Sequence, residues 1–134
     1  MNNIITEELM PALEGAIPGI IATASATGIP NATYIWQVFY VDEYHVALSR
    51  QFFKKTLDNI MENPQACVLV TSPVSYQMYK LYLQFVESQT QGPVFEKMAL
   101  QMEVIAGMQR GIDTFDLLAA DIYKVIRIER IQLS

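Results

Sequence analysis

The sequence has very few of the residues that build metal centres, disulfide frameworks and many catalytic sites. Its 134 residues include one cysteine, Cys67, and one histidine, His45. A single cysteine excludes an internal disulfide and fits a reducing compartment, so we expect a cytoplasmic protein. The chain cannot assemble a zinc site rich in histidine or cysteine by itself. A Ser-His-Asp triad would have to use His45, which we interpret as a partly exposed residue at the start of a strand.

Long apolar runs, excess positive charge and phosphate-loop motifs are also absent from the sequence. No run approaches the roughly 18 apolar residues of a membrane span, and the N-terminus does not resemble a signal peptide, so we expect no membrane partner. Nine lysines and arginines stand against fourteen aspartates and glutamates, a net charge of -5. This balance argues against a nucleic-acid partner. Neither the dinucleotide-binding nor the P-loop glycine motif occurs.

What the sequence does contain is typical of one folded domain. Hydrophobic residues make up 51% of the chain and charged residues 17%, which is too apolar a composition for disorder. A chain of 134 residues is long enough to bury a substantial core. Because no repeat, low-complexity tract or linker interrupts it, we expect residues 1–134 to form a single domain.

Apolar patterns predict a mainly β protein with flanking helices. Six strands are expected over residues 20–24, 31–41, 44–48, 65–71, 76–86 and 122–133. Helices are expected over residues 6–14, 51–62 and 93–107. The second helix is expected to turn Phe53, Leu57, Ile60 and Met61 inward, and the third to place Met98 and Met102 in the core. The unbroken apolar run over residues 66–70 predicts a strand that is buried on both faces. Thr6 and Ser49 are placed to cap the first two helices. A change of parity in the last strand predicts either a bulge or burial of both faces. The short connections indicate a closed antiparallel barrel with helices covering its ends.

The long strand predicted over residues 31–41 has bulky residues on both faces. Its even positions are all large: Tyr34, Trp36, Val38 and Tyr40. Such a face is too apolar to leave in water, so it is expected to lie against another subunit or a ligand. We therefore predict a homodimer.

The stretch from Ser49 to Thr56 concentrates positive charge in an acidic chain. Arg50, Lys54 and Lys55 fall within six positions, where a strand is expected to end and a helix to begin. Arginine offers a planar fork, lysine a compact charge, and a helix start free N–H groups, all of which suit a phosphate. The alternative interpretation is a solvated basic helix face, and the spacing by itself leaves both open.

The order of these features resembles that of the pyridoxamine 5'-phosphate oxidase-like family. The resemblance rests on residues 18–24, 28–31 and 46–50 and on the helix that ends at Asn63-Pro64, and it extends over most of the chain. It implies a six-stranded antiparallel split β-barrel of the FMN-binding type. It also implies a homodimer with FMN between the subunits.

The resemblance assigns contacts along the cofactor from ring to phosphate. The implied contacts are Thr33, Tyr34 and Ile35 along the flavin ring, Leu48 and Ser49 near the ring and ribityl chain, and Arg50, Lys55 and Thr56 at the phosphate, with Lys54 as a further candidate. Thr56 stands where the family usually has a phosphate-binding lysine. The sequence also stops at Ser134 without the C-terminal extension of vitamin B6 oxidases, so pyridoxamine phosphate is not the expected substrate.

Two functions remain open at this point. The first is an FMN-dependent oxidoreductase that acts on an unknown small molecule, in which the flavin carries the redox chemistry. No residue stands out as an acid or base, although Tyr34, Gln37 and Gln84 are polar side chains on apolar strands. The second is a non-catalytic flavin or haem carrier or sensor, since some relatives bind haem or a deazaflavin. Haem ranks below FMN because His45 is the only histidine available as an axial ligand.

Overall fold

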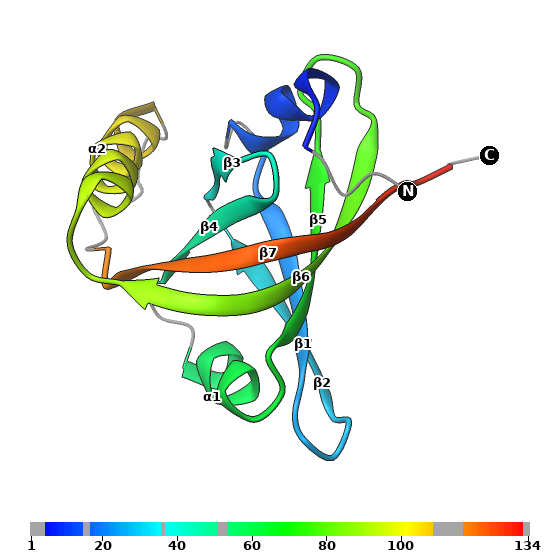
Figure 1. Cartoon of the computed structure of the whole chain (residues 1–134). Coiled ribbons are helices and arrows are strands. Elements are labelled where there is room, and N and C mark those ends of the chain that lie inside the picture. The colour runs from blue at the N-terminus through cyan, green and yellow to red at the C-terminus, as the bar shows by residue number, and fades with distance from the viewer. Residues whose placement is uncertain (1–4, 15–16, 36, 51–53, 109–116, 133–134) are drawn as a thin grey trace.

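The computed structural model describes residues 5–14, 17–35, 37–50, 54–108 and 117–132. Seven strands form one antiparallel sheet, in the order β2-β1-β5-β6-β7-β4-β3. Figure 1 shows the sheet curling around a central core. The strands are β1 (Gly19–Ala24), β2 (Pro30–Ile35), β3 (Val38–Asp42), β4 (His45–Arg50), β5 (Gln65–Thr71), β6 (Met78–Gln89) and β7 (Ala119–Arg130).

Three helices accompany the sheet: η1 (Glu7–Leu13), α1 (Lys54–Glu62) and α2 (Pro93–Met108). In Figure 1, η1 and α1 lie at opposite ends of the sheet and α2 stands beside it. η1 is a 3-10 helix that contains Pro11, and Thr6 at its start makes no capping hydrogen bond through its side chain. The predicted Thr6 cap is therefore wrong. In the described part of the chain, no helix is long and apolar enough to cross a membrane.

The sheet differs from the expected six-stranded closed barrel in its strand count and its closure. The single strand predicted over residues 31–41 is two strands, β2 and β3, that form the two ends of the sheet order. No ladder joins β2 to β3 among the described residues. Ile35 of β2 and Val38 of β3 are both buried, although one is at an odd and the other at an even position. The break turns both side chains toward the core, which one regular strand could not do.

The main core lies inside the curl and is built by alternating positions of the strands. On β6 the buried side chains are Tyr79, Leu81 and Leu83, as the alternating pattern predicts. On β5 the strand bounds are confirmed, but Cys67 and Leu69 remain half-buried. The prediction that both faces of β5 are buried is therefore wrong.

The long β6–β7 ladder contains the bulge that the parity change predicts. Tyr82 pairs with Arg127 and Leu83 with Val125, so Ile126 on β7 has no opposite residue. A second shift leaves Val86 of β6 unpaired in the same way. Extra residues of this kind bend a strand and increase its twist, which allows these two 12-residue strands to curve around the core.

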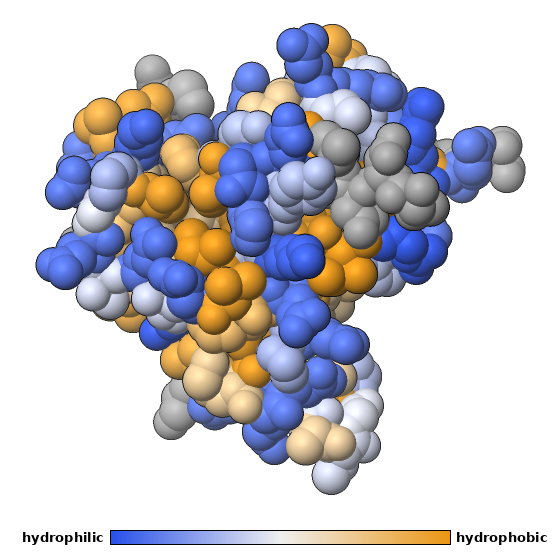
Figure 2. All heavy atoms as spheres, viewed as in Figure 1, coloured by the Kyte–Doolittle hydropathy of each residue, from blue (hydrophilic) through white to orange (hydrophobic). Residues whose placement is uncertain are grey.

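A second, smaller apolar cluster lies between α2 and the sheet. Its buried members are Ala47, Met98, Ala120 and Ile122. Met98 and Met102 face inward from α2, as their helical spacing predicts. Figure 2 shows apolar atoms still visible at the surface in the region between α2 and the strands.

Candidate functional site

The candidate site lies beneath α1, where strands from both ends of the sheet order approach one another. A cavity of about 10 Å³ is found here, lined by residues of β1, β2, β4, β7 and α1. Its lining consists of Ile21, Ile35, Leu48, Ser49, Arg50, Thr56, Leu57, Ile60, Asp121 and Tyr123. The enclosed space has room for about one water molecule. Five of the nine residues predicted to hold a cofactor are in this lining.

Ser49 is the first unusual residue of the cavity. It lies within β4 and not at a helix start, so the prediction that it caps a helix is wrong. The residue is 1% exposed, and its hydroxyl has no hydrogen-bond partner in the described structure. Because an unpaired buried hydroxyl costs roughly 1–3 kcal/mol, this atom marks a place for a polar atom of a ligand or a water.

Arg50 ends β4 and is held by an acidic residue of the neighbouring strand. Its Nε donates to Asp121 Oδ2 at 3.1 Å and its Nη2 to Asp121 Oδ1 at 2.7 Å. Nη2 also donates to the Ser88 hydroxyl at 2.5 Å, and that hydroxyl donates to Asp121 Oδ1 at 2.6 Å. The hydrogen bond to Asp121 raises the pKa of Arg50, against the opposing effect of burial. The guanidinium is therefore charged and fixed in position.

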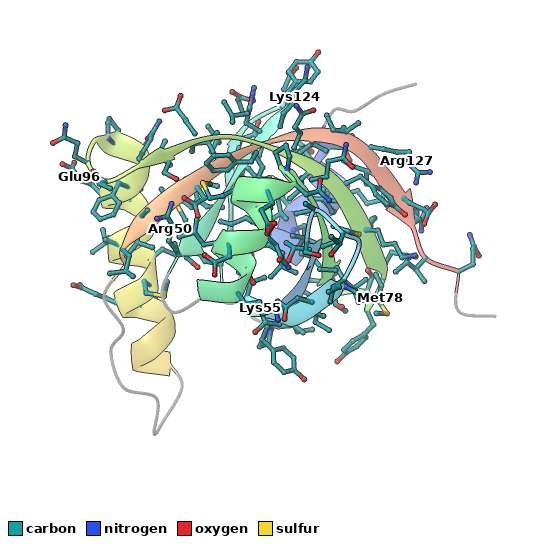
Figure 3. The ribbon with its side chains drawn as sticks, turned by 90° about the horizontal axis from the view of Figure 1, so that it is seen from below. Arg50, Lys55, Met78, Glu96, Lys124 and Arg127 are labelled. Carbon is teal, nitrogen blue, oxygen red and sulfur yellow. The ribbon has the colours of Figure 1, made fainter. Side chains whose placement is uncertain are left out.

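Helix α1 brings a hydroxyl to the cavity but turns a lysine away from it. Thr56 is 6% exposed, and its Oγ1 accepts a hydrogen bond of 3.4 Å from Asn31 Nδ2 on β2. Lys55 is exposed to solvent, and Figure 3 shows it well separated from Arg50. Lys54 is the first residue of α1, and its side chain lies outside the described part. The predicted basic cluster is thus divided between the cavity and the surface.

The predicted ring contacts on β2 are also divided. Ile35 is 1% exposed and lines the cavity. Thr33 is half-buried on the same side of the strand, opposite Ile21 of β1. Tyr34 points the other way and is 67% exposed. Since neighbouring side chains of a strand alternate, only Thr33 and Ile35 face the region covered by α1.

Sequence reasoning missed the acidic partner and the tyrosine of this site. Asp121 and Tyr123 both lie on β7 and line the cavity. Burial raises the pKa of Tyr123, and the negative charge of Asp121 adds to the increase. The Tyr123 ring packs edge-on against Phe85 at 5.5 Å between centroids. One signal was available, because Asp121 is the single charged residue between Leu117 and Tyr123.

Other residues singled out in the sequence have roles away from the cavity. Gln37 is buried and donates through Nε2 to Met98 O at 3.0 Å and to Gln101 Oε1 at 2.8 Å, so it attaches α2 to the chain just before β3. Gln84 is exposed on β6. His45 lies half-buried at the start of β4 and pairs with Asp42 at 2.8 Å. No group of three or more potential metal ligands occurs among the residues that the structure describes.

The polar part of the cavity lining suits one end of a phosphorylated ligand. The unpaired Ser49 hydroxyl, the Thr56 hydroxyl and the Arg50 guanidinium all border the same space. The cavity itself is far smaller than an isoalloxazine ring, which would have to lie outside the enclosed volume. The residues therefore fit the anionic tail of a flavin nucleotide, while the cavity formed by the described residues of one chain does not enclose its ring.

Residues 5–125 match the model of the pyridoxamine 5'-phosphate oxidase family. The chain belongs to this family. Over 66 residues, 48% of its length, it is 38% identical to an uncharacterized protein of Methanocaldococcus jannaschii. That match spans 44% of the relative, so the chain matches less than half of that protein's length.

Solved structures of other proteins share the fold at low sequence identity. An FMN-binding protein from Syntrophomonas wolfei superposes with a TM-score of 0.77 and 16% identity, covering 95% of this chain and 86% of that one. An F420 reductase superposes with a TM-score of 0.67 and 14% identity, covering 93% and 98%. These likenesses establish the mainly β antiparallel architecture of the family for this chain.

Proposed function

We propose that this protein binds FMN and acts as a flavin-dependent oxidoreductase on a small molecule. The single observation that carries the proposal is the unpaired, buried hydroxyl of Ser49 beside Arg50 and Thr56. The family match and the fold likeness to an FMN-binding protein support the choice of ligand. When bound, the flavin would supply the hydride or electron transfer. The chain's own residues would bind and orient it.

The phosphate end is the part that the described side chains can hold. Arg50 would contribute its charge, and Ser49 and Thr56 would donate hydrogen bonds from their hydroxyls. Thr33 and Ile35 would border the ring from β2, beside Leu48 of β4. Lys54 and Lys55 remain predicted phosphate contacts, and the exposed position of Lys55 favours a smaller contribution from it than from Arg50.

A homodimer belongs to the same proposal, because the enclosed cavity of one chain is too small for the flavin ring. Fewer residues of the predicted apolar face are available to a partner subunit than the sequence indicated. Val38 is buried in the chain's own core and Tyr40 packs against it, Trp36 lies outside the described residues, and Tyr34 remains exposed. Light scattering should give twice the chain mass of 15.2 kDa. A mass of one chain at micromolar concentration would contradict the dimer.

Two alternative ligands are distinguished by specific observations. The likeness to an F420 reductase favours a deazaflavin as the second candidate. Haem has less support, because His45 is paired with Asp42 and is not among the residues that line the cavity. A flavin carrier or sensor without turnover would use the same binding residues.

Titration of the purified protein with FMN, followed by flavin fluorescence, tests the proposal. We expect saturable binding and a weakening of about tenfold or more in Arg50→Ala, since a charge-assisted contact contributes roughly 1.5–3 kcal/mol. Lys55→Ala should have a smaller effect. Arg127→Ala is the matched control, because it removes the same charge from an exposed position.

Two results would contradict parts of this proposal. Equal FMN affinity in wild type and Arg50→Ala would mean that the phosphate lies elsewhere. If the wild-type protein bound F420 and not FMN, the cofactor would be a deazaflavin and the proposal of FMN would be wrong. Reduction of the bound flavin by a nicotinamide donor, seen as loss of its visible absorbance, then separates an oxidoreductase from a carrier.

A further inference from the structure

We infer that Asp121 determines how strongly this site prefers a phosphorylated flavin over an unphosphorylated one, because its carboxylate occupies the guanidinium of Arg50. The inference rests on the proposed function, in which Arg50 meets the phosphate. It makes Asp121 a specificity-determining residue that lowers phosphate affinity, and it makes Ser88 the residue that holds this carboxylate in place.

The hydrogen bonds leave Arg50 only part of its binding capacity. Asp121 accepts from both Nε and Nη2, and Ser88 accepts a further bond from Nη2. These contacts take the side of the guanidinium that best matches an oxyanion with two parallel hydrogen bonds. Only Nη1 is not used by them. A phosphate must therefore bind through that nitrogen or displace the carboxylate.

The charges of the pair cancel where a phosphate would need a positive potential. Arg50 and Asp121 are the cation and the carboxylate of the cavity lining, and their side chains are 22% and 11% exposed. At such burial a carboxylate beside the phosphate is weakly screened, so it opposes binding nearly as strongly as the arginine favours it. Lys55 is exposed to solvent, so its charge does not replace the positive potential that Asp121 cancels in the cavity.

The sheet register shows that the carboxylate is built into this position. Asp121 lies opposite Leu48 of β4 and opposite Ser88 of β6, so it stands between the two strands that supply its partners. Ser88 both accepts from Arg50 and donates to Asp121 Oδ1 at 2.6 Å. The three side chains form a closed triangle, which keeps the carboxylate on the guanidinium when no ligand is bound.

A different role for Asp121 predicts the opposite result. If the carboxylate only oriented Arg50 for the phosphate, its removal would loosen the guanidinium and weaken FMN binding. If it competes with the phosphate, its neutralisation strengthens FMN binding. Riboflavin, which has the same ring without the phosphate, separates both effects from changes in the ring site.

The experiment measures dissociation constants of FMN and riboflavin by fluorescence titration in wild type, Asp121→Asn and Asp42→Asn. In Asp121→Asn we expect the preference for FMN over riboflavin to increase about tenfold, as removal of one nearby charge at low exposure predicts. The affinity for riboflavin should stay within about twofold. Asp42 is the matched control, because it is also a hydrogen-bonded carboxylate but lies outside the cavity lining.

A second variant keeps the test decisive if Asp121→Asn does not fold. Ser88 is exposed, so Ser88→Asp adds a second carboxylate beside Arg50 without burying it. The added negative charge outweighs the lost hydrogen bond to Asp121, so the preference for FMN should decrease. The inference would be overturned by an unchanged or decreased preference for FMN in Asp121→Asn, or by an unchanged preference in Ser88→Asp. Flavin binding by the wild type would still support the proposed function in that case. Wild-type protein that binds neither FMN nor riboflavin would overturn the proposed function and this inference with it.

Discussion

The two α-helices of this protein are attached to the sheet in different ways. α1 is held by side-chain hydrogen bonds to strands at one end of the sheet order: Asn59 Nδ2 donates to Thr23 Oγ1 at 3.1 Å, and Asn31 donates to Thr56. α2 is held by the buried Met98 and by one side chain, Gln37, which donates two hydrogen bonds to it. These hydrogen bonds explain why two of the buried residues of α1, Thr56 and Asn59, are polar.

The outer surfaces of the helices differ as well. α2 exposes two large apolar residues, Leu100 at 65% and Val104 at 56%, whereas the described part of α1 exposes one, Met61 at 60%. Hydrogen bonds fix a helix in one rotation and one register, while an apolar contact tolerates small shifts. The difference teaches that α1, which borders the cavity, is fixed through two of its own side chains to two strands, whereas one side chain fixes α2. The two attachments keep Thr56 and Ile60 in the cavity lining.

The largest expected effect comes from truncating the buried apolar residue of each helix. Ile60→Ala and Met98→Ala should each lower the free energy of unfolding by about 2–5 kcal/mol, because each leaves a cavity in a packed cluster. Only Ile60→Ala should also weaken FMN binding, since Ile60 lines the candidate site and Met98 does not. Urea unfolding and FMN titration of both variants measure this.

Met61→Ala is the control for these two variants. Its side chain is exposed on the same helix as Ile60, so the change in stability should stay within about 0.5 kcal/mol. If Met98→Ala weakened FMN binding as much as Ile60→Ala, the two helices would not have the separate roles described above.

A smaller effect is expected from removing the polar attachment of each helix. Asn59→Ala and Gln37→Ala should each cost about 1–3 kcal/mol, because each leaves a buried partner without its hydrogen bond. Hydrogen exchange should show faster exchange in α1 for Asn59→Ala and in α2 for Gln37→Ala. Faster exchange of both helices in either variant would show one cooperative unit in place of two independent attachments.

Much of the secondary structure could be predicted from local pattern. The strand over residues 65–71, the helix that begins at Pro93 and the bulge in the last strand are all confirmed. The predictions for α1 were less accurate, because the apolar stripe was expected to include Met61, which is exposed. The buried residues Thr56 and Asn59 are polar, and only their partners on β1 and β2 explain their burial.

The candidate site could be predicted only in part. Arg50, Ser49 and Thr56 were identified from a cluster of cations and hydroxyls close together in sequence, and they do meet at one cavity. The separation of Lys55 from Arg50 could not be foreseen, because β4 ends between the two residues and α1 then turns Lys55 toward solvent. Asp121 could not be paired with Arg50 either, because a pairing between distant strands depends on the sheet order.

The sequence by itself determined the family, the mainly β architecture and most strand and helix positions, because periodicity and turn chemistry act over a few neighbouring residues. The tertiary structure decided which charges meet. Arg50 and Asp121 are 71 positions apart, and they become partners because β4 and β7 pair in the sheet. Their ion pair depends on distances that only folding creates, and it decides how much positive charge remains for a ligand.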